Sequence, residues 1–125
     1  YYIYGDDKVG NSIFAKLQQA HVERKKTFPF TSGKNKYDFV HIDKLAEMIS
    51  YTILQENING VINCCSGKPV ALGVQIEEYI KNNNLNITLE YGAFKDRPYD
   101  SPAIWGDSSK IEKIYQQRGI NFCGK

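Results

Sequence analysis

Residues 37–49 of the chain read YDFVHIDKLAEMI, and this stretch decides the fold. Its first part, from Tyr37 to Ile42, alternates in polarity and is rich in aromatic and β-branched residues, which favours a short strand. Asp43 can cap a helix that follows at once. A strand that leads directly into a helix predicts an α/β fold. The apolar face predicted for this helix consists of Leu45, Ala46, Ile49 and Ile53.

The alternation of strands and helices begins before this stretch. Residues 1–4 are β-prone, and a helix starts near a cap at Asn11 or Ser12. Residues 28–31 are expected to be extended, because Pro29 disfavours helical backbone in the residue before it. The first strand begins at the first residue, without a turn or a cap before it, so we expect that a preceding segment was removed.

The same alternation continues towards the end of the chain. Residues 61–65 form a nearly unbroken apolar run, VINCC, which is typical of a strand covered on both faces. A third helix then follows Ala71, and residues 86–91 alternate as a strand. Ser109 and Glu112 have the spacing of a capping box for a last helix. The apolar residues predicted on these two helices are Leu72, Ile76, Tyr79 and Ile80, and then Ile111, Ile114 and Tyr115.

The composition argues against several classes of protein. The 125 residues carry 16 basic and 14 acidic side chains, a formal net charge of +2, and the densest basic run, residues 24–26, falls at a predicted helix end. We therefore expect no nucleic-acid partner. No apolar run has the length of a membrane span, so we expect no membrane partner either. Cys64, Cys65 and Cys123 form no Cys-x-x-Cys pair, which predicts a reduced, cytoplasmic protein without a metal site.

Signatures of catalysis are nearly absent from the sequence. It contains no Gly-x-Gly-x-x-Gly fingerprint, no phosphate-binding P-loop and no His-Glu-x-x-His helix. Tyr91 and Lys95 have the spacing Tyr-x-x-x-Lys, a pair in which the lysine prepares the tyrosine for acid–base chemistry. Gly92 and the nearby Pro98 disfavour the helix that would place both side chains on one face. We therefore interpret the spacing as a coincidence and expect no catalytic residue.

The segment KDRPYD, residues 95–100, is the strongest candidate for a binding loop. Arg97 precedes Pro98, which stiffens the backbone, and Asp100 follows three residues later. An arginine fork can bind a diphosphate through two hydrogen bonds, and a nearby carboxylate can accept hydrogen bonds from sugar hydroxyls. The alternative interpretation of this segment is a solvated loop with an ion pair.

Four segments in this order resemble the C-terminal half of a known family. They are YYIYG, YDFVHIDKLAEMI, GVINCCSGKPV and RPYDSPAIWGDSSKI, and the family is the NAD-dependent epimerase/dehydratase family of extended short-chain dehydrogenases/reductases. The resemblance implies that residues 1–125 are a small mixed α/β substrate-binding domain whose Rossmann half is missing. That missing half would bind NAD or NADP, carry the catalytic Tyr-x-x-x-Lys pair and form a homodimer. No cofactor is expected to bind this fragment.

The resemblance also implies roles for particular residues, with a nucleoside-diphosphate sugar as the ligand. Tyr37 stands where the family usually has an arginine, so one phosphate-binding arginine is missing, which favours a divergent ketoreductase or dehydratase. The substrate-binding residues implied are Asn11 and Ser12 near the diphosphate, Phe28 and Phe30 beside the nucleoside base, Arg97 on a phosphate, Asp100 on the ribose, and Tyr37.

Two functions follow from these observations. The first is the substrate-binding part of an NAD(P)-dependent nucleotide-sugar epimerase, dehydratase or 4-ketoreductase, which moves a hydride at the C4 atom of the sugar. This part would be inactive alone, because the catalytic pair and the cofactor fingerprint are absent from it. The alternative is a free-standing nucleotide- or sugar-binding scaffold module without catalysis.

Overall fold

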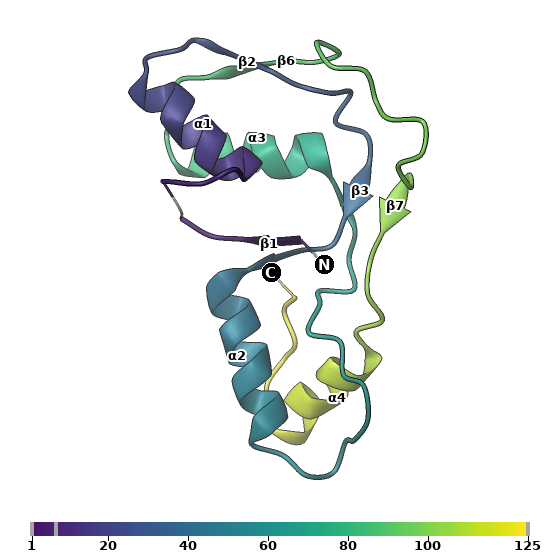
Figure 1. Ribbon diagram of the computed structural model, residues 1–125. Coiled ribbons are helices and arrows are strands. Elements are labelled where there is room, and N and C mark those ends of the chain that lie inside the picture. Colours follow the sequence, from purple (N-terminus) through teal and green to yellow (C-terminus); the bar gives the residue numbers. More distant parts are fainter. Residues whose placement is uncertain (1, 7, 125) are drawn as a thin grey trace. The chain divides into compact units, whose positions relative to one another are not determined.

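The computed structural model describes residues 2–6 and 8–124, and the chain divides into two compact units (Figure 1). Unit 1 comprises residues 1–5, 37–69 and 103–125, and unit 2 comprises residues 6–36 and 70–102. Both units combine helices with strands, so the predicted mixed α/β class is confirmed. The predicted start of the first strand at residue 1 lies outside the described residues. None of the described helices is long and apolar enough to cross a bilayer.

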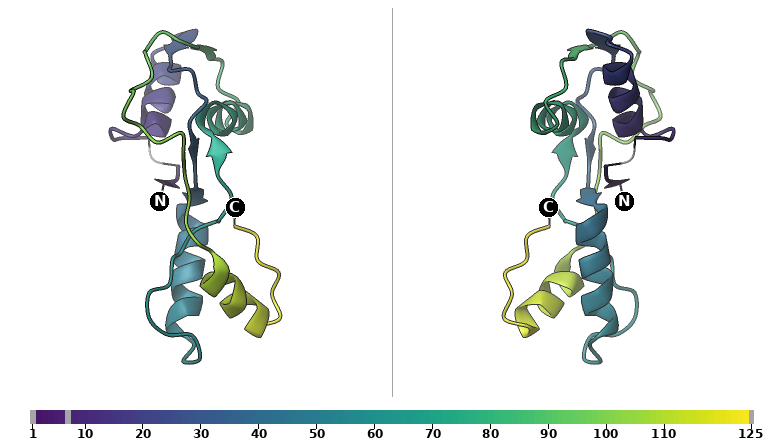
Figure 2. Two further views of the ribbon diagram at one scale, coloured as in Figure 1. Left: turned by 90° about the vertical axis from the view of Figure 1, so that its right-hand side faces the viewer. Right: turned by 90° about the vertical axis from the view of Figure 1, so that its left-hand side faces the viewer.

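Unit 1 contains two parallel strands and two helices. Strand β1 (Tyr2–Tyr4) pairs with β4 (Phe39–His41) in parallel. Helix α2 (Ile42–Ile53) follows β4 directly and packs beside helix α4 (Ser109–Gln117), as both views of Figure 2 show. The buried core of the unit consists of Val40, Met48, Ile111, Ile114 and Tyr115.

The single strand predicted over residues 37–42 is interrupted at Asp38, whose side chain is fully buried. One carboxylate oxygen, Oδ1, accepts the backbone N–H of Ser66 at 2.9 Å. The other, Oδ2, accepts the N–H groups of Gly67 at 2.9 Å and of Gly106 at 3.1 Å. Charge-assisted hydrogen bonds of this kind compensate the loss of hydration of a buried carboxylate. Asp38 therefore ties three segments of unit 1 together.

The predicted apolar face of helix α2 is confirmed at Leu45 and wrong at its other three residues. Leu45 and Met48 pack into the core, whereas Ala46, Ile49 and Ile53 are exposed, with 75% of Ile53 accessible. The helix has apolar residues on two faces, and helical periodicity alone does not show which of them meets α4.

Two helix caps also differ from the prediction. The N-cap of α2 is His41 instead of Asp43, because His41 is extended and its Nδ1 accepts the N–H of Asp43 at 3.3 Å. In α4, Ser109 is the first helical residue, so Ser108 takes the N-cap position. The N–H of Ser109 is accepted by the carboxylate of Asp107 at 2.9 Å, which serves the first turn of the helix in place of the expected capping box.

Residues 61–65, which were predicted to form a strand covered on both faces, do not form one. No strand in the described part of the chain pairs with this segment, and Val61 is 82% exposed. The side chain of Lys110 donates hydrogen bonds to the carbonyl oxygens of Asn59 and Val61 at 2.9 and 2.8 Å. At the end of the segment Cys65 is buried as expected, and this burial raises the pKa of its thiol to about 11.

Unit 2 also contains two helices and a pair of parallel strands. Its helices are α1 (Ile13–Val22) and α3 (Leu72–Asn82), which pack together (Figure 1). Its strands are β2 (Thr27–Pro29) and β6 (Thr88–Glu90), which pair in parallel. The two strands come from segments that are far apart in the sequence, so their pairing joins the two parts of the chain that make up unit 2.

The helices of unit 2 form as the sequence predicts. Ser12 caps α1 by accepting the N–H of Ala15 at 3.0 Å, and Ala71 precedes α3 without a side-chain cap. The rings of Phe14 in α1 and Tyr79 in α3 meet edge to face with their centroids 4.9 Å apart. This buried contact between the two predicted apolar faces forms part of the core of unit 2.

Three further strands are only two residues long. They lie where the chain passes between the sequence segments of the two units, and they are β3 (Lys36–Tyr37), β5 (Val70–Ala71) and β7 (Ala103–Ile104).

Candidate functional site

A cavity of about 370 Å³ in unit 2 gathers several of the residues that the sequence singled out. Asn11, Phe28, Phe30 and Arg97 all line it, although they come from three separate segments of the chain. Lys16 of helix α1 lines it as well. A polar residue, two aromatic rings and two cations therefore meet around one concave surface, which is the arrangement of a small-molecule site.

The start of helix α1 places Asn11 at one wall of this cavity. Asn11 precedes the N-cap residue Ser12, so the unpaired backbone N–H groups and the positive end of the helix dipole lie next to it. The hydroxyl of Ser12 accepts the N–H of Ala15, and Ser12 is not among the residues that line the cavity. The structure thus gives the predicted pair different positions: Asn11 at the cavity and Ser12 at the helix cap.

Strand β2 and the residue after it form an aromatic wall of the cavity. Phe28 and Pro29 lie in β2, and Phe30 follows with only 2% of its surface exposed. The backbone of Phe30 donates to the carbonyl of Glu90 at 3.1 Å and accepts the N–H of Phe94 at 3.1 Å. These two backbone hydrogen bonds hold the Phe30 ring in one position at the cavity.

Two glycines, Gly33 and Gly73, approach each other closely beside the ring of Phe30. A Cβ atom at Gly33 would lie 3.0 Å from the Cα of Gly73 and 3.0 Å from the rings of Phe30 and Tyr91. The ring of Tyr91 packs edge to face on Phe30 with a centroid distance of 5.4 Å, and its hydroxyl donates to Glu77 at 3.0 Å. Burial, together with the neighbouring Glu77 carboxylate, raises the pKa of Tyr91. Tyr91 therefore positions Phe30.

The Tyr-x-x-x-Lys spacing from Tyr91 to Lys95 does not lie on a helix. Residues 91–94 are turns and bends, and Gly92 has a positive φ of 80°. Residues 91–95 therefore lack the helical face that this pair needs for acid–base chemistry, as Gly92 and Pro98 predict.

The loop that carries Arg97 is a tight turn anchored to the aromatic wall. The N–H of Asp100 donates to the carbonyl of Arg97 at 3.1 Å, which closes a β-turn with Pro98 at its second position. Just before the turn, Asp96 accepts the N–H of Ser32 at 3.1 Å, and hydrogen bonds from Ser32 lower the pKa of the Asp96 carboxyl. Arg97 lines the cavity, whereas Asp100 is not among its lining residues.

The charged side chains known to line the cavity are both positive. Among the described residues, its lining includes Lys16 and Arg97 but no aspartate or glutamate. Within residues 2–6 and 8–124, neither of these two cations forms an ion pair with a carboxylate. A concave surface with two unpaired cations and a helix N-terminus favours an anionic ligand.

The last predicted residue, Tyr37, is not among the residues that line the cavity. Tyr37 belongs to unit 1, where its ring packs on Tyr2 with a centroid distance of 4.3 Å and near Phe39 at 6.1 Å. Lys16 and Phe94 were missed. Lys16 lies on the polar side of an amphipathic helix, and Phe94 lies in a loop without periodicity, so no pattern connected either residue with the cavity.

Unit 1 has a larger cavity, of about 550 Å³, at the ends of helices α2 and α4. Glu56 and Arg118 both line this cavity. The guanidinium of Arg118 stacks over the ring of Tyr51, 4.5 Å from the ring centroid. None of the predicted binding residues lies there. We therefore take the cavity of unit 2, where cations without carboxylate partners meet predicted residues, as the candidate site.

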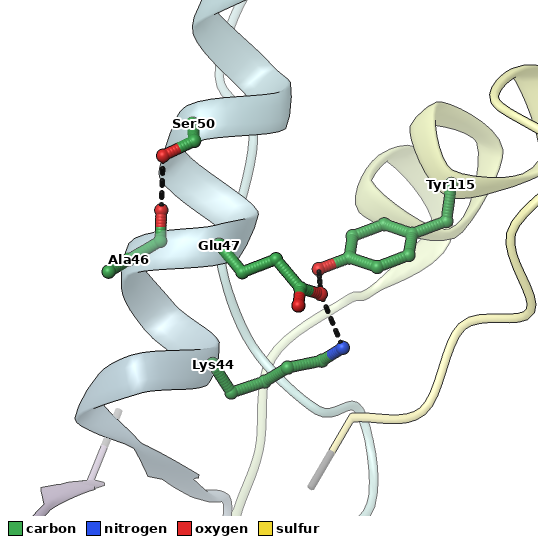
Figure 3. A network of polar contacts seen from close by, with 5 residues as sticks. All are labelled: Lys44, Ala46, Glu47, Ser50 and Tyr115. Atoms are coloured by element: carbon green, nitrogen blue, oxygen red, sulfur yellow. Dashed lines mark hydrogen bonds and ion pairs between the residues drawn. The ribbon is translucent and has the colours of Figure 1, made fainter.

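A polar network between α2 and α4 has a structural role. Figure 3 shows that the Tyr115 hydroxyl and the Lys44 ammonium both reach the Glu47 carboxylate, each at 2.6 Å from Oε1. Hydrogen bonds from Lys44 and Tyr115 lower the pKa of Glu47, while burial raises that of Tyr115 above its ordinary range. Ser50 donates to the backbone of Ala46 in the same helix. These contacts fix the two helices together.

The sequence has no glycine-rich strand-turn-helix fingerprint for a dinucleotide. Residues 2–6 and 8–124 contain no group of at least three His, Cys, Asp or Glu side chains that could hold a metal. The described residues that line the cavity favour an anionic organic ligand, and no cofactor position is assigned to it.

Comparison with known proteins finds two proteins that are named for nucleotide sugars. No family model matches the chain. A curated relative, the dTDP-6-deoxy-L-talose 4-dehydrogenase (NAD(+)) of Aggregatibacter actinomycetemcomitans, is 46% identical over 106 residues, which are 85% of this chain and 39% of the relative. The structure of a GDP-mannoheptose C4 reductase from Campylobacter jejuni, with NADP bound, has the same fold, with a TM-score of 0.65 at 18% identity.

The match to the solved structure covers 99% of this chain and 42% of that protein. This chain thus spans about two fifths of the length of each of the two proteins. The likeness to the reductase concerns the fold, and the likeness to the talose dehydrogenase also extends to the sequence. The chain is homologous to part of the extended short-chain dehydrogenases/reductases that serve as nucleotide-sugar dehydrogenases and reductases.

Proposed function

We propose that this chain is the C-terminal, substrate-binding part of an NAD(P)-dependent oxidoreductase that acts at the C4 atom of a nucleoside-diphosphate sugar. In this proposal residues 1–125 form the substrate domain, and the cavity of unit 2 holds the nucleoside diphosphate. One observation carries the proposal: Arg97, Asn11 and two phenylalanines line a single cavity, and no carboxylate of the described residues lines it. The names of both relatives, a 4-dehydrogenase and a C4 reductase, support redox chemistry at C4 over epimerisation or dehydration.

The chemistry of the wall suits each part of such a ligand. The guanidinium of Arg97 can donate two parallel hydrogen bonds to phosphate oxygens, and the β-turn that follows it limits its movement. The N-terminus of α1 beside Asn11 adds backbone N–H donors. Phe28 offers an apolar surface for a base, whereas Phe30, with only 2% of its surface exposed, forms part of the wall that supports it. Binding the ligand through its nucleotide leaves the sugar free to reach the reaction centre.

The remaining steps of catalysis belong to residues outside this chain. When bound, NAD(P) supplies the acceptor or donor of the hydride, and the sequence of this chain contains no glycine-rich dinucleotide fingerprint. We expect the chain alone to bind nucleoside diphosphates and to show no NAD-dependent oxidation or reduction of a nucleotide sugar. Turnover by this chain alone would contradict the assignment of its role. The free-standing module would show the same binding and inactivity, but within a gene that encodes no dinucleotide-binding half.

The proposal is tested by calorimetric titration of the protein with dTDP, the nucleotide of the talose relative's substrate. We expect Arg97→Ala to weaken binding by roughly tenfold or more, because hydrogen bonds to a charged group are lost. Arg118→Ala is the matched control, since Arg118 lines the cavity of unit 1. No binding by the unaltered protein, or equal weakening by both substitutions, would overturn the proposal.

A further inference from the structure

Lys16 lies between two adjoining cavities of unit 2. The candidate cavity of about 370 Å³ and a second one of about 250 Å³ share three lining residues, which are Lys16, Phe28 and Pro29. The two cavities are neighbours that meet at this shared wall along α1 and β2. Among the described residues, Lys16 is the only charged residue that lines both of them.

The other cation of the smaller cavity is already paired. Lys25 contacts Glu23 at 2.7 Å, and this hydrogen-bonded pair lowers the pKa of Glu23. Lys16 has no carboxylate partner within the described residues, and neither has Arg97 in the larger cavity. Two positive charges therefore remain available to one ligand, and they come from different elements, helix α1 and the 95–100 loop.

We propose that Lys16 and Arg97 divide the diphosphate of the ligand between them, so that the cavity selects nucleoside diphosphates over monophosphates. This inference rests on the function proposed above. A lysine ammonium suits this role because it acts as a compact charge on a flexible stem beside the fixed arginine fork.

The test compares three ligands, which are dTDP, dTMP and thymidine, by calorimetric titration at low salt. We expect Lys16→Gln to weaken dTDP binding by roughly tenfold or more and to leave thymidine binding unchanged, because only the phosphates contact the ammonium. Lys16→Arg keeps the charge and should retain most of the affinity for dTDP. Lys81→Gln, in the last turn of α3, removes an exposed charge of the same unit away from both cavities and should have no effect.

The outcomes separate this inference from the proposed function. If the unaltered protein binds dTDP and Arg97→Ala weakens that binding, but Lys16→Gln does not, the role of Lys16 is wrong and the proposed function stands. Equal losses for dTDP and thymidine in Lys16→Gln would mean that Lys16 acts through packing, which also overturns the inference. If dTDP does not bind at all, both fall. Unchanged circular dichroism of each variant excludes misfolding as the cause.

Discussion

At the scale of single residues, the carboxylate of Asp38 determines how unit 1 is held together. It accepts three backbone N–H groups, from Ser66, Gly67 and Gly106, and it is fully buried. The donors come from two segments that are distant from Asp38 in the sequence. Removing the charge would leave backbone donors in the interior without acceptors, which is more costly than losing an exposed ion pair.

The change Asp38→Asn tests this role. The amide replaces one acceptor oxygen by an NH₂ group that faces a backbone donor, so we expect the free energy of unfolding to fall by about 2–3 kcal/mol. Urea denaturation followed by circular dichroism measures the difference. Asp107→Asn is the control, because Asp107 accepts the N–H of Ser109 at an exposed site and should matter less. Equal effects of the two substitutions would refute the role of Asp38.

At the scale of elements, Gly33 determines how closely the loop after β2 approaches Gly73 in the first turn of α3. Gly33 has a φ of 68° and no space for a side chain, whereas Gly92 has a φ of 80° and open space, with nothing within 4 Å of the point where a Cβ atom would lie. The two glycines therefore separate backbone strain from steric crowding. A left-handed backbone costs an L-residue roughly 1–2 kcal/mol.

We expect Gly92→Ala to lower the free energy of unfolding by only this strain, about 1 kcal/mol. Gly33→Ala should lower it further, because the new methyl group would press on Gly73 and on the rings of Phe30 and Tyr91. It should also weaken dTDP binding, since Phe30 lines the cavity. Thermal unfolding and calorimetric titration give the two quantities. Equal stability of both variants would show that the close approach is not needed.

The contact between α2 and α4 predicts that the stability of the fold depends on pH. Hydrogen bonds from Lys44 and Tyr115 lower the pKa of Glu47 in the folded state below its ordinary value of 4.5. The ionised carboxylate therefore stabilises the fold at pH values above 4.5, and this contribution is lost as the pH falls below that value. The effect is small, because the side chain of Glu47 is 41% exposed and water screens the interaction.

Glu47→Gln removes this titration. We expect the variant to be less stable than the unaltered protein at neutral pH, with the difference shrinking on acidification below pH 4.5. Urea denaturation over a series of pH values measures it. A difference that stays constant across the series would show that the carboxylate contributes nothing through its charge.

At the scale of the whole molecule, the sequence predicted where helices form better than it predicted which faces are buried and which strands pair. The faces of α3 and α4 were correct because each of these helices has one apolar face and one polar face. The face of α2 was correct only at Leu45, because that helix has two apolar faces. The strand predicted over the apolar run at residues 61–65 was wrong, because a strand needs a neighbouring strand to pair with.

The candidate site was predictable only in part. Arg97 was found through its proline-stiffened loop, and Asn11, Phe28 and Phe30 through the resemblance of ordered segments. Lys16 was not found, because a lysine on a polar helix face looks like a solvated residue until the cavity beside it is known. Asp100 was expected on the ligand, yet it closes the β-turn instead of lining the cavity. Contacts between segments that are distant in the sequence determine these positions, and local sequence patterns do not reveal such contacts.

The most direct test of nucleotide binding by unit 2 is a titration of the isotope-labelled protein with dTDP, followed through its backbone amide resonances. We expect the largest shifts at Asn11, Phe30 and Arg97, around the cavity with two cations. Shifts concentrated at Gln117 and Arg118, at the larger cavity of unit 1, or no shifts at all, would contradict the assignment of this site.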